Sequence, residues 1–120
     1  MAQPVVWFEV MGQNADNMKK FYGDMFDWNL DLNNPMKYGM LDKQGEGTIP
    51  GGVGVNDAGP GWSTFYVKVD AIDDSLAKAE QLGARVLLPK MQTPDGGHIA
   101  VFADPEGHPV GLVEYPAASA

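Results

Sequence analysis

The chain contains no cysteine, which excludes disulfide frameworks, thiolate zinc sites and cysteine nucleophiles. Basic residues are scarce: 8 Lys plus Arg stand against 16 Asp plus Glu, so the formal net charge is 8 − 16 = −8. Because an acidic surface is repelled by phosphate groups, we expect no nucleic-acid partner. No apolar run approaches the roughly 20 residues that a membrane-spanning helix needs, so we expect no membrane association.

The opening segment MAQPVVWFEV lacks the basic and apolar regions of a secretory signal, and we expect a cytoplasmic protein. The length of 120 residues fits a single domain that covers residues 1–120. Three catalytic templates are absent from the sequence: G-x-S-x-G, G-x-x-x-x-G-K-[ST] and H-E-x-x-H. Common hydrolase, nucleotide-binding and zinc-protease sites are therefore not expected.

The first half of the chain predicts one helix among four strands. The predicted order is a strand from Val5 to about Gly12, a helix from Ala15 to Phe26, and strands at Trp28–Leu32, Lys37–Leu41 and Ile49–Val55. Apolar residues in the helical segment recur every three or four positions. We expect Met18, Phe21 and Met25 to pack in the core.

The second half repeats this order after a Gly/Pro-rich linker at 56–61. It predicts a strand at Ser63–Val69, a helix from Ile72 that ends near Gly83, and strands at Arg85–Leu88, His98–Ala103 and Pro109–Tyr115, with 89–97 as loop. An offset of 57 places Trp7 on Thr64. The sequence therefore predicts an α+β fold of two tandem β-α-β-β-β units, roughly 4–55 and 62–116, that form a cupped mixed sheet.

Three segments resemble the vicinal oxygen chelate superfamily, which includes glyoxalase I, extradiol dioxygenases and bleomycin-resistance proteins. They are Val5–Val10 followed by Phe21-Tyr22-Gly23 and Phe26-Asp27-Trp28, then Val67–Asp70 with Leu82-Gly83-Ala84, and Phe102–Gly107 with its Asp-Pro-Glu-Gly turn. Together they span nearly the whole chain. The chain is most similar to the short glyoxalase-like proteins of bacteria. The resemblance implies a glyoxalase/bleomycin-resistance-like fold, but not a particular reaction, because this fold serves several chemistries.

Metal-dependent members of the superfamily hold a divalent ion between imidazole and carboxylate ligands. Carried over by the resemblance, the ligand positions fall on Trp7, Thr64, Gly111 and the stretch 52–54, none of which supplies a metal donor. We therefore expect no metal and no other cofactor at this site.

Strand alternation predicts which side chains share a face. Trp7 and Glu9 have the same parity, as do Thr64 with Tyr66 and Gly111 with Val113. We expect these six residues to contact a small-molecule ligand, with flat aromatic walls and a hydroxyl or carboxylate for orientation. Glu114 has the opposite parity to Gly111 and is expected on the outer face.

The sequence favours a metal-free small-molecule-binding protein of the glyoxalase/bleomycin-resistance type. Its acidic site would suit a cationic or amphipathic ligand, and its role would be to sequester that ligand. Whether it catalyses a reaction is left open. One alternative is a glyoxalase-like lyase or isomerase in which Glu9 is the general base, hydrogen-bonded by Thr64 and Tyr66. Another is a dioxygenase-type enzyme with a metal on Glu9, His98 and Glu114.

A third alternative is a structural or regulatory dimer module in which Trp7 fills the cup. The resemblance also implies a homodimer, since members of this fold commonly pair and two four-stranded units expose sheet edges.

Overall fold

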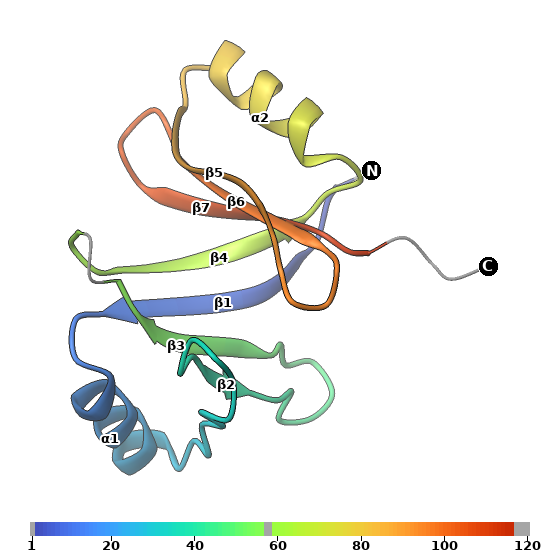
Figure 1. Cartoon of the computed structure of the whole chain (residues 1–120). Helices are drawn as coiled ribbons and strands as arrows, with labels where there is room; N and C mark the ends of the chain where they lie inside the picture. Colours follow the sequence, from blue (N-terminus) through green and yellow to red (C-terminus); the bar gives the residue numbers. More distant parts are fainter. Residues whose placement is uncertain (1, 57–58, 117–120) are drawn as a thin grey trace. The chain divides into compact units, whose positions relative to one another are not determined.

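The computed structural model describes residues 2–56 and 59–116. The chain divides into two compact units, Trp7–Thr64 and Met1–Val6 together with Phe65–Ala120, which we call the N-terminal and the C-terminal unit. The seven strands and two helices found in these described residues confirm the predicted α+β class. Each unit combines one helix with a small mixed sheet (Figure 1).

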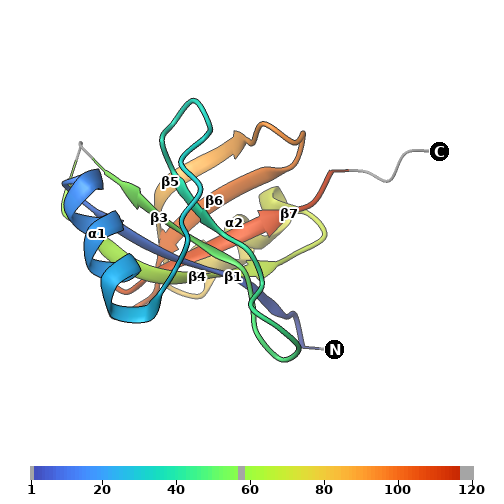
Figure 2. The same ribbon diagram turned by 90° about the horizontal axis from the view of Figure 1, so that it is seen from below.

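The N-terminal unit is built on a parallel pair of strands. Strand β1 (Val5–Gly12) pairs in parallel with β3 (Gly51–Val55), and β3 pairs antiparallel with β2 (Gly39–Leu41). The β1–β3 register sets Glu9 opposite Gly52. Figure 2 shows β1 and β3 side by side in a second view.

Helix α1 (Ala15–Phe26) starts where the side chain of Asn14 accepts a hydrogen bond from the backbone N–H of Asn17, at 2.9 Å. It ends at Asp27, whose φ of 57° is left-handed and stops the helix. Met18 and Tyr22 pack against a core of Leu30, Leu41 and Val53, together with Phe8, Val10 and Trp28.

The prediction that Phe21 and Met25 pack in the core is wrong, since their side chains are 59% and 63% exposed. Successive residues of a helix are turned by about 100°, so one sheet reaches only a limited arc of the helix. That arc holds Met18 and Tyr22, which are four positions apart. Phe21 and Met25 form a neighbouring row that the sheet does not cover.

The predicted strand at Trp28–Leu32 is also wrong, because only a single bridge forms there, between Asp31 and Met40. Its two backbone hydrogen bonds measure 3.0 and 2.9 Å. Leu30 is buried in the core and Trp28 stacks on Tyr22, with ring centroids 5.4 Å apart. The residues of this segment are therefore apolar because they pack against α1, and not because the segment pairs in a sheet.

The C-terminal unit has four strands in the order β4-β7-β6-β5. They are β4 (Trp62–Lys68, which belongs to this unit from Phe65 onward), β5 (Arg85–Gln92), β6 (His98–Ala103) and β7 (Pro109–Glu114). Strand β4 pairs in parallel with β7. Helix α2 (Ile72–Gln81) packs over this sheet, and Ile72 is fully buried with Val69, Ala100 and Leu112. Strand β5 continues through Pro89, which the sequence had placed in a loop. It lies at the end of the strand order, where a missing backbone N–H is tolerated.

Candidate functional site

Glu9 on β1 is the most unusual residue of the N-terminal unit, because it is an acidic residue and yet only 7% exposed. Burial of a carboxylate is costly unless hydrogen bonds replace its water. Tyr38 donates its hydroxyl to one carboxylate oxygen at 2.9 Å, and the indole N–H of Trp62 donates to the other at 3.0 Å. Hydrogen bonds to a charged group contribute about 1.5–3 kcal/mol each, so these two offset much of the cost.

Trp7 extends this arrangement to a third aromatic ring. Its indole N–H donates to the hydroxyl oxygen of Tyr38 at 3.1 Å. The hydroxyl of Tyr38 thus accepts from Trp7 and donates to Glu9, which fixes its direction. We call these four residues, Trp7, Glu9, Tyr38 and Trp62, the Glu9 network.

Tyr38 is positioned by a short loop before β2. The side chain of Asn34 accepts a hydrogen bond from the backbone N–H of Tyr38 at 2.9 Å and donates one to its carbonyl at 2.6 Å. Lys37 adopts a left-handed φ of 53°, which turns the chain just ahead of Tyr38. Both features hold the ring in place over the sheet.

The ring of Tyr38 lies directly on β3, where glycines leave space for it. A Cβ atom on Gly52 would fall inside the van der Waals radius of the ring, and one on Gly54 would lie 2.6 Å from Cδ2 of Tyr38. Since Gly52 is the register partner of Glu9, the absent side chain lets the phenol reach the carboxylate. The stretch 52–54, where the resemblance puts a metal ligand, is covered by a tyrosine ring instead.

In the C-terminal unit a tyrosine ring also lies on a glycine of the sheet. The offset of 57 places Glu9 on Tyr66, and the register pairs Tyr66 with Gly111 as it pairs Glu9 with Gly52. A Cβ atom on Gly111 would lie 2.5 Å from the ring of Tyr66, which is 4% exposed. This second glycine, another inherited ligand position, is also covered by a tyrosine.

The other predicted site residues are distributed over both units. Trp7 and Glu9 belong to the Glu9 network, and Thr64 is a buried polar residue of the same N-terminal unit. Val113 in the C-terminal unit pairs with Lys68 and Ile99.

Glu114 has a structural role in the C-terminal unit. One of its carboxylate oxygens accepts a hydrogen bond from the backbone N–H of Ile72 at 2.9 Å, and the other lies 3.3 Å from Nδ1 of His98. Because Ala71 offers no side-chain cap, Glu114 satisfies the first turn of α2 in its place.

His108 follows the turn predicted at 104–107, and its side chain is 71% exposed. Its backbone N–H donates to Asp104 at 2.9 Å, and this hydrogen bond is the main cause that holds the pKa of the Asp104 carboxyl below its usual range. Asp104 therefore serves to close the turn.

The side chains that could act as metal ligands are not grouped as the metal of this fold family would need. Within residues 2–56 and 59–116, no three His, Asp or Glu side chains gather where they could hold an ion. The alternative metal set takes Glu9 from the N-terminal unit and His98 and Glu114 from the C-terminal unit, and it stays a prediction. Glu114 is engaged by α2 and His98, and Glu9 by two aromatic donors.

Sequence reasoning missed Tyr38 and Trp62. Both lie outside the positions that the resemblance marks, and Tyr38 was assigned to a short strand. The available signal was the glycine-rich stretch Gly51–Gly54, since side chains missing from a buried strand indicate that a ring or backbone approaches closely.

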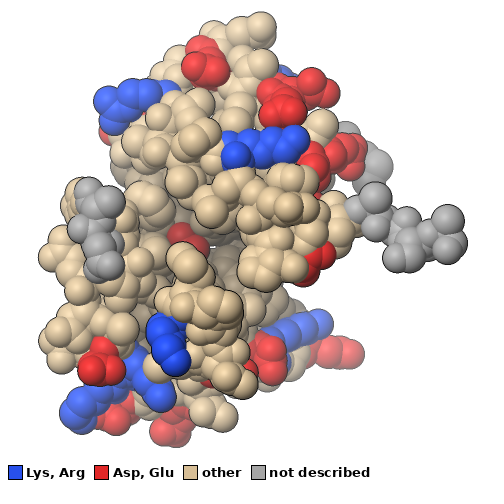
Figure 3. All heavy atoms as spheres, in the orientation of Figure 1, with Lys and Arg blue, Asp and Glu red and all other residues tan. Residues whose placement is uncertain are grey.

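The charged side chains form no single-sign patch on the face drawn in Figure 3, where acidic and basic groups are interspersed. By sequence, each unit carries 8 acidic and 4 basic residues, a net charge of 4 − 8 = −4. No helix in the part of the chain that the structure describes is long and apolar enough to cross a membrane.

Replacing Gly52 by alanine tests the packing of Tyr38. The new methyl group collides with the ring, so we expect a loss of about 1–3 kcal/mol in the free energy of unfolding, as for other overpacked sites. Gly23→Ala in α1 is the matched control. Its Cβ would meet only the carbonyl of Trp28 at 3.5 Å, and helix propensity predicts a gain of about 0.5–1 kcal/mol. Urea unfolding of both variants measures the difference, and equal stabilities would contradict this placement of Tyr38.

Comparison with known proteins agrees with the fold. The glyoxalase-like domain family matches residues 7–113. Curated relatives named "Putative glyoxylase CFP32" in Mycobacterium bovis and Mycobacterium tuberculosis are 30% identical over 116 residues, which cover 88% of this chain and 43% of theirs. The chain thus spans less than half the length of these relatives.

Solved structures of epimerases show the same fold at low identity. A methylmalonyl-CoA epimerase variant from Streptomyces coelicolor, in complex with 2-nitronate-propionyl-CoA, gives a TM-score of 0.65 at 16% identity, covering 100% of this chain and 99% of its own. Methylmalonyl-CoA epimerase from Mycobacterium tuberculosis gives 0.59 at 16% identity, covering 95% and 88%. The chain belongs to the glyoxalase-like domain family of the vicinal oxygen chelate superfamily.

Proposed function

We propose that this chain is a metal-free small-molecule-binding domain whose ligand joins a positive charge to an apolar body. The observation that carries the proposal is the Glu9 network: a buried carboxylate held in a fixed direction by Tyr38 and Trp62. Ligand sites of this kind combine apolar walls with a few oriented polar groups.

The chemistry of the network favours a cation. A carboxylate supplies the negative charge, and the faces of indole and phenol rings attract cations through their quadrupoles, by about 0.5–2 kcal/mol each. The N-terminal unit, which contains all four network residues, carries a net charge of −4. That field raises the local concentration of cationic ligands.

The proposed contacts are the four residues of the Glu9 network. We propose no role for the metal that the fold family implies, because the ligand positions carried over by the resemblance are Trp7, Thr64, Gly111 and the stretch 52–54, which supply no metal donor. Such a site binds and retains a ligand, which corresponds to sequestration. The sequence also predicts ligand contacts for four further residues, and these contacts remain predictions: Thr64, Tyr66, Gly111 and Val113.

Choline and its uncharged carbon isostere 3,3-dimethyl-1-butanol test the proposal, because they differ only in the charge. We expect choline to bind at least about tenfold more tightly, which corresponds to 1.4 kcal/mol. The indole N–H resonances in NMR titrations measure binding. Those of Trp7 and Trp62 should move, whereas that of Trp28, stacked on Tyr22, should not.

Glu9→Gln should remove the preference for choline, and Glu46→Gln, an exposed acid of the same unit, should retain it. Equal affinity for the two ligands, or an unchanged preference in Glu9→Gln, would contradict a cation site.

A second candidate is an isomerase or epimerase, favoured by the direct hydrogen bond between the hydroxyl of Tyr38 and Glu9. A carboxylate can remove the proton from a carbon acid, which leaves a planar enolate and a carboxylic acid. If the enolate turns over before that acid returns a proton to the carbon, the configuration is inverted. In this mechanism Glu9 is the base and Tyr38 orients it.

Solvent exchange separates the two candidates. Methylmalonyl-CoA incubated with the protein in deuterium oxide should gain deuterium at its acidic carbon if Glu9 is a base, and Glu9→Gln should abolish the gain. The binding proposal predicts no incorporation above the rate without protein, measured by mass spectrometry.

A further inference from the structure

One row of residues crosses all three strands of the N-terminal sheet at the level of Glu9. The register places Glu9 on β1 opposite Gly52 on β3, and Gly52 opposite Met40 on β2. Register partners point to the same face of a sheet, and neighbouring strands lie about 4.8 Å apart. The side chains of Glu9 and Met40 therefore leave the same face about 10 Å apart, with only the backbone of Gly52 between them.

The ring of Tyr38 fills the space between the two outer strands on this face. A Cβ atom on Gly52 or on Gly54 would meet the ring, so the ring spans both glycines of β3. Met11 on β1 is the register partner of Gly54, and its Sδ would lie 3.0 Å from a Cβ atom there. The ring thus lies between Met11 on β1 and Met40 on β2. We call these three residues, Met11, Tyr38 and Met40, the Tyr38 platform.

Exposure rises along the row from the buried acid to the edge of the sheet. Glu9 is 7% exposed, Tyr38 is half-buried and Met40 is 40% exposed. The other face of this sheet packs on α1 and its core. A ligand that contacts Met40 therefore does so on the same face as Glu9.

We propose that the Tyr38 platform binds the apolar body of the ligand and that Met40 sets the length of that body. This inference rests on the cation site proposed above, with the positive charge at Glu9. A linear chain that starts there crosses the ring of Tyr38 and reaches Met40 after about 10 Å, which is about eight carbon atoms in extended form. The ligand class is then an ammonium ion with one linear alkyl chain.

The side chains of the platform fit such a chain. Methionine is unbranched and its thioether is polarizable, so it adapts to apolar groups of different shape. The face of a phenol ring is flat and apolar, and it attracts the positive end of the ligand as well.

Alkyltrimethylammonium ions with chains from ethyl to dodecyl test the length, in calorimetric titrations below their micelle-forming concentrations. Each methylene group that the platform buries should tighten binding by up to about fourfold. We expect this gain to stop near eight carbons, because a longer chain extends past Met40 into water. In NMR spectra the methyl resonance of Met40 should move with the octyl compound and not with the ethyl compound.

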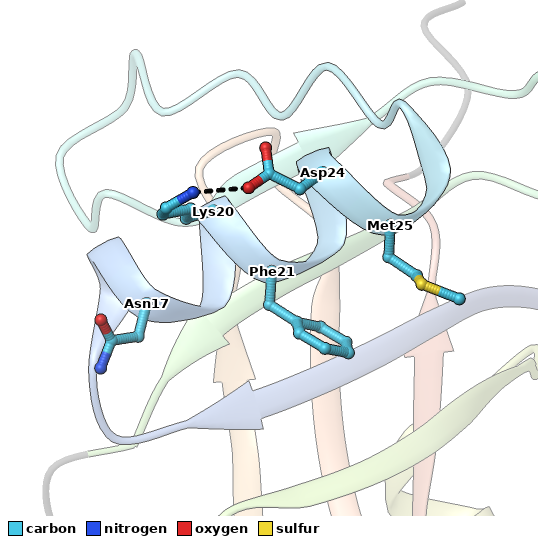
Figure 4. A pocket seen from close by; sticks show the side chains of 5 residues that line it. All are labelled: Asn17, Lys20, Phe21, Asp24 and Met25. Carbon is cyan, nitrogen blue, oxygen red and sulfur yellow. Dashed lines mark hydrogen bonds and ion pairs between the residues drawn. The ribbon is translucent and has the colours of Figure 1, made fainter.

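Met40→Ala should weaken binding of the octyl compound at least about fivefold and leave that of the ethyl compound unchanged. Met25→Ala is the matched control. Met25 belongs to the same unit and is 63% exposed, but it projects from α1 (Figure 4). This variant should leave every affinity unchanged.

The outcomes separate this inference from the cation site itself. Affinities that do not depend on chain length, or that Met40→Ala does not alter, would overturn the role of the platform while the preference for choline stands. If 1-octanol binds as tightly as the octyl ammonium ion and is weakened by Met40→Ala, the platform is supported and the cation site is contradicted. Binding of none of these compounds would overturn both.

Discussion

The burial of the Glu9 carboxylate is the constraint on which the N-terminal site depends. A charge on the inner part of a sheet must be hydrogen-bonded, and here the donors are ring groups of Tyr38 and Trp62. That requirement explains why Gly52 lacks a side chain and why Asn34 clamps the backbone of Tyr38. Residues from three other segments, namely the loop at 34–38, β3 and β4, are thus arranged around one carboxylate.

The two halves of the chain share one packing feature. In each unit a tyrosine ring lies on a glycine of the sheet, Tyr38 on Gly52 and Tyr66 on Gly111, where the resemblance expects a metal ligand at 52–54 and at Gly111. The two rings come from different elements, since Tyr38 precedes β2 and Tyr66 lies within β4. Our proposal is that these phenol rings take the space of imidazole and carboxylate ligands and so favour organic ligands over ions.

The spacing of apolar residues along the sequence predicted much of this fold, because helices and strands each repeat with their own local period. The alternation of the first strand predicted that Glu9 and Trp7 share a face, and both belong to the Glu9 network. The contacts of Tyr38 and Trp62 could not be predicted, since they join segments 29 and 53 residues away along the chain. The exposure of Phe21 was missed for another reason: a helical pattern does not reveal how wide an arc the sheet covers.

The most direct test of the account is the metal content of untagged protein purified without chelators and dialysed against iron, zinc, manganese and nickel. The account holds that aromatic rings have taken the place of the metal ligands. Elemental mass spectrometry should then find well below about one ion per ten chains. Close to one tightly bound ion per chain would contradict it, and would show that the donors assemble differently from the Glu9 network.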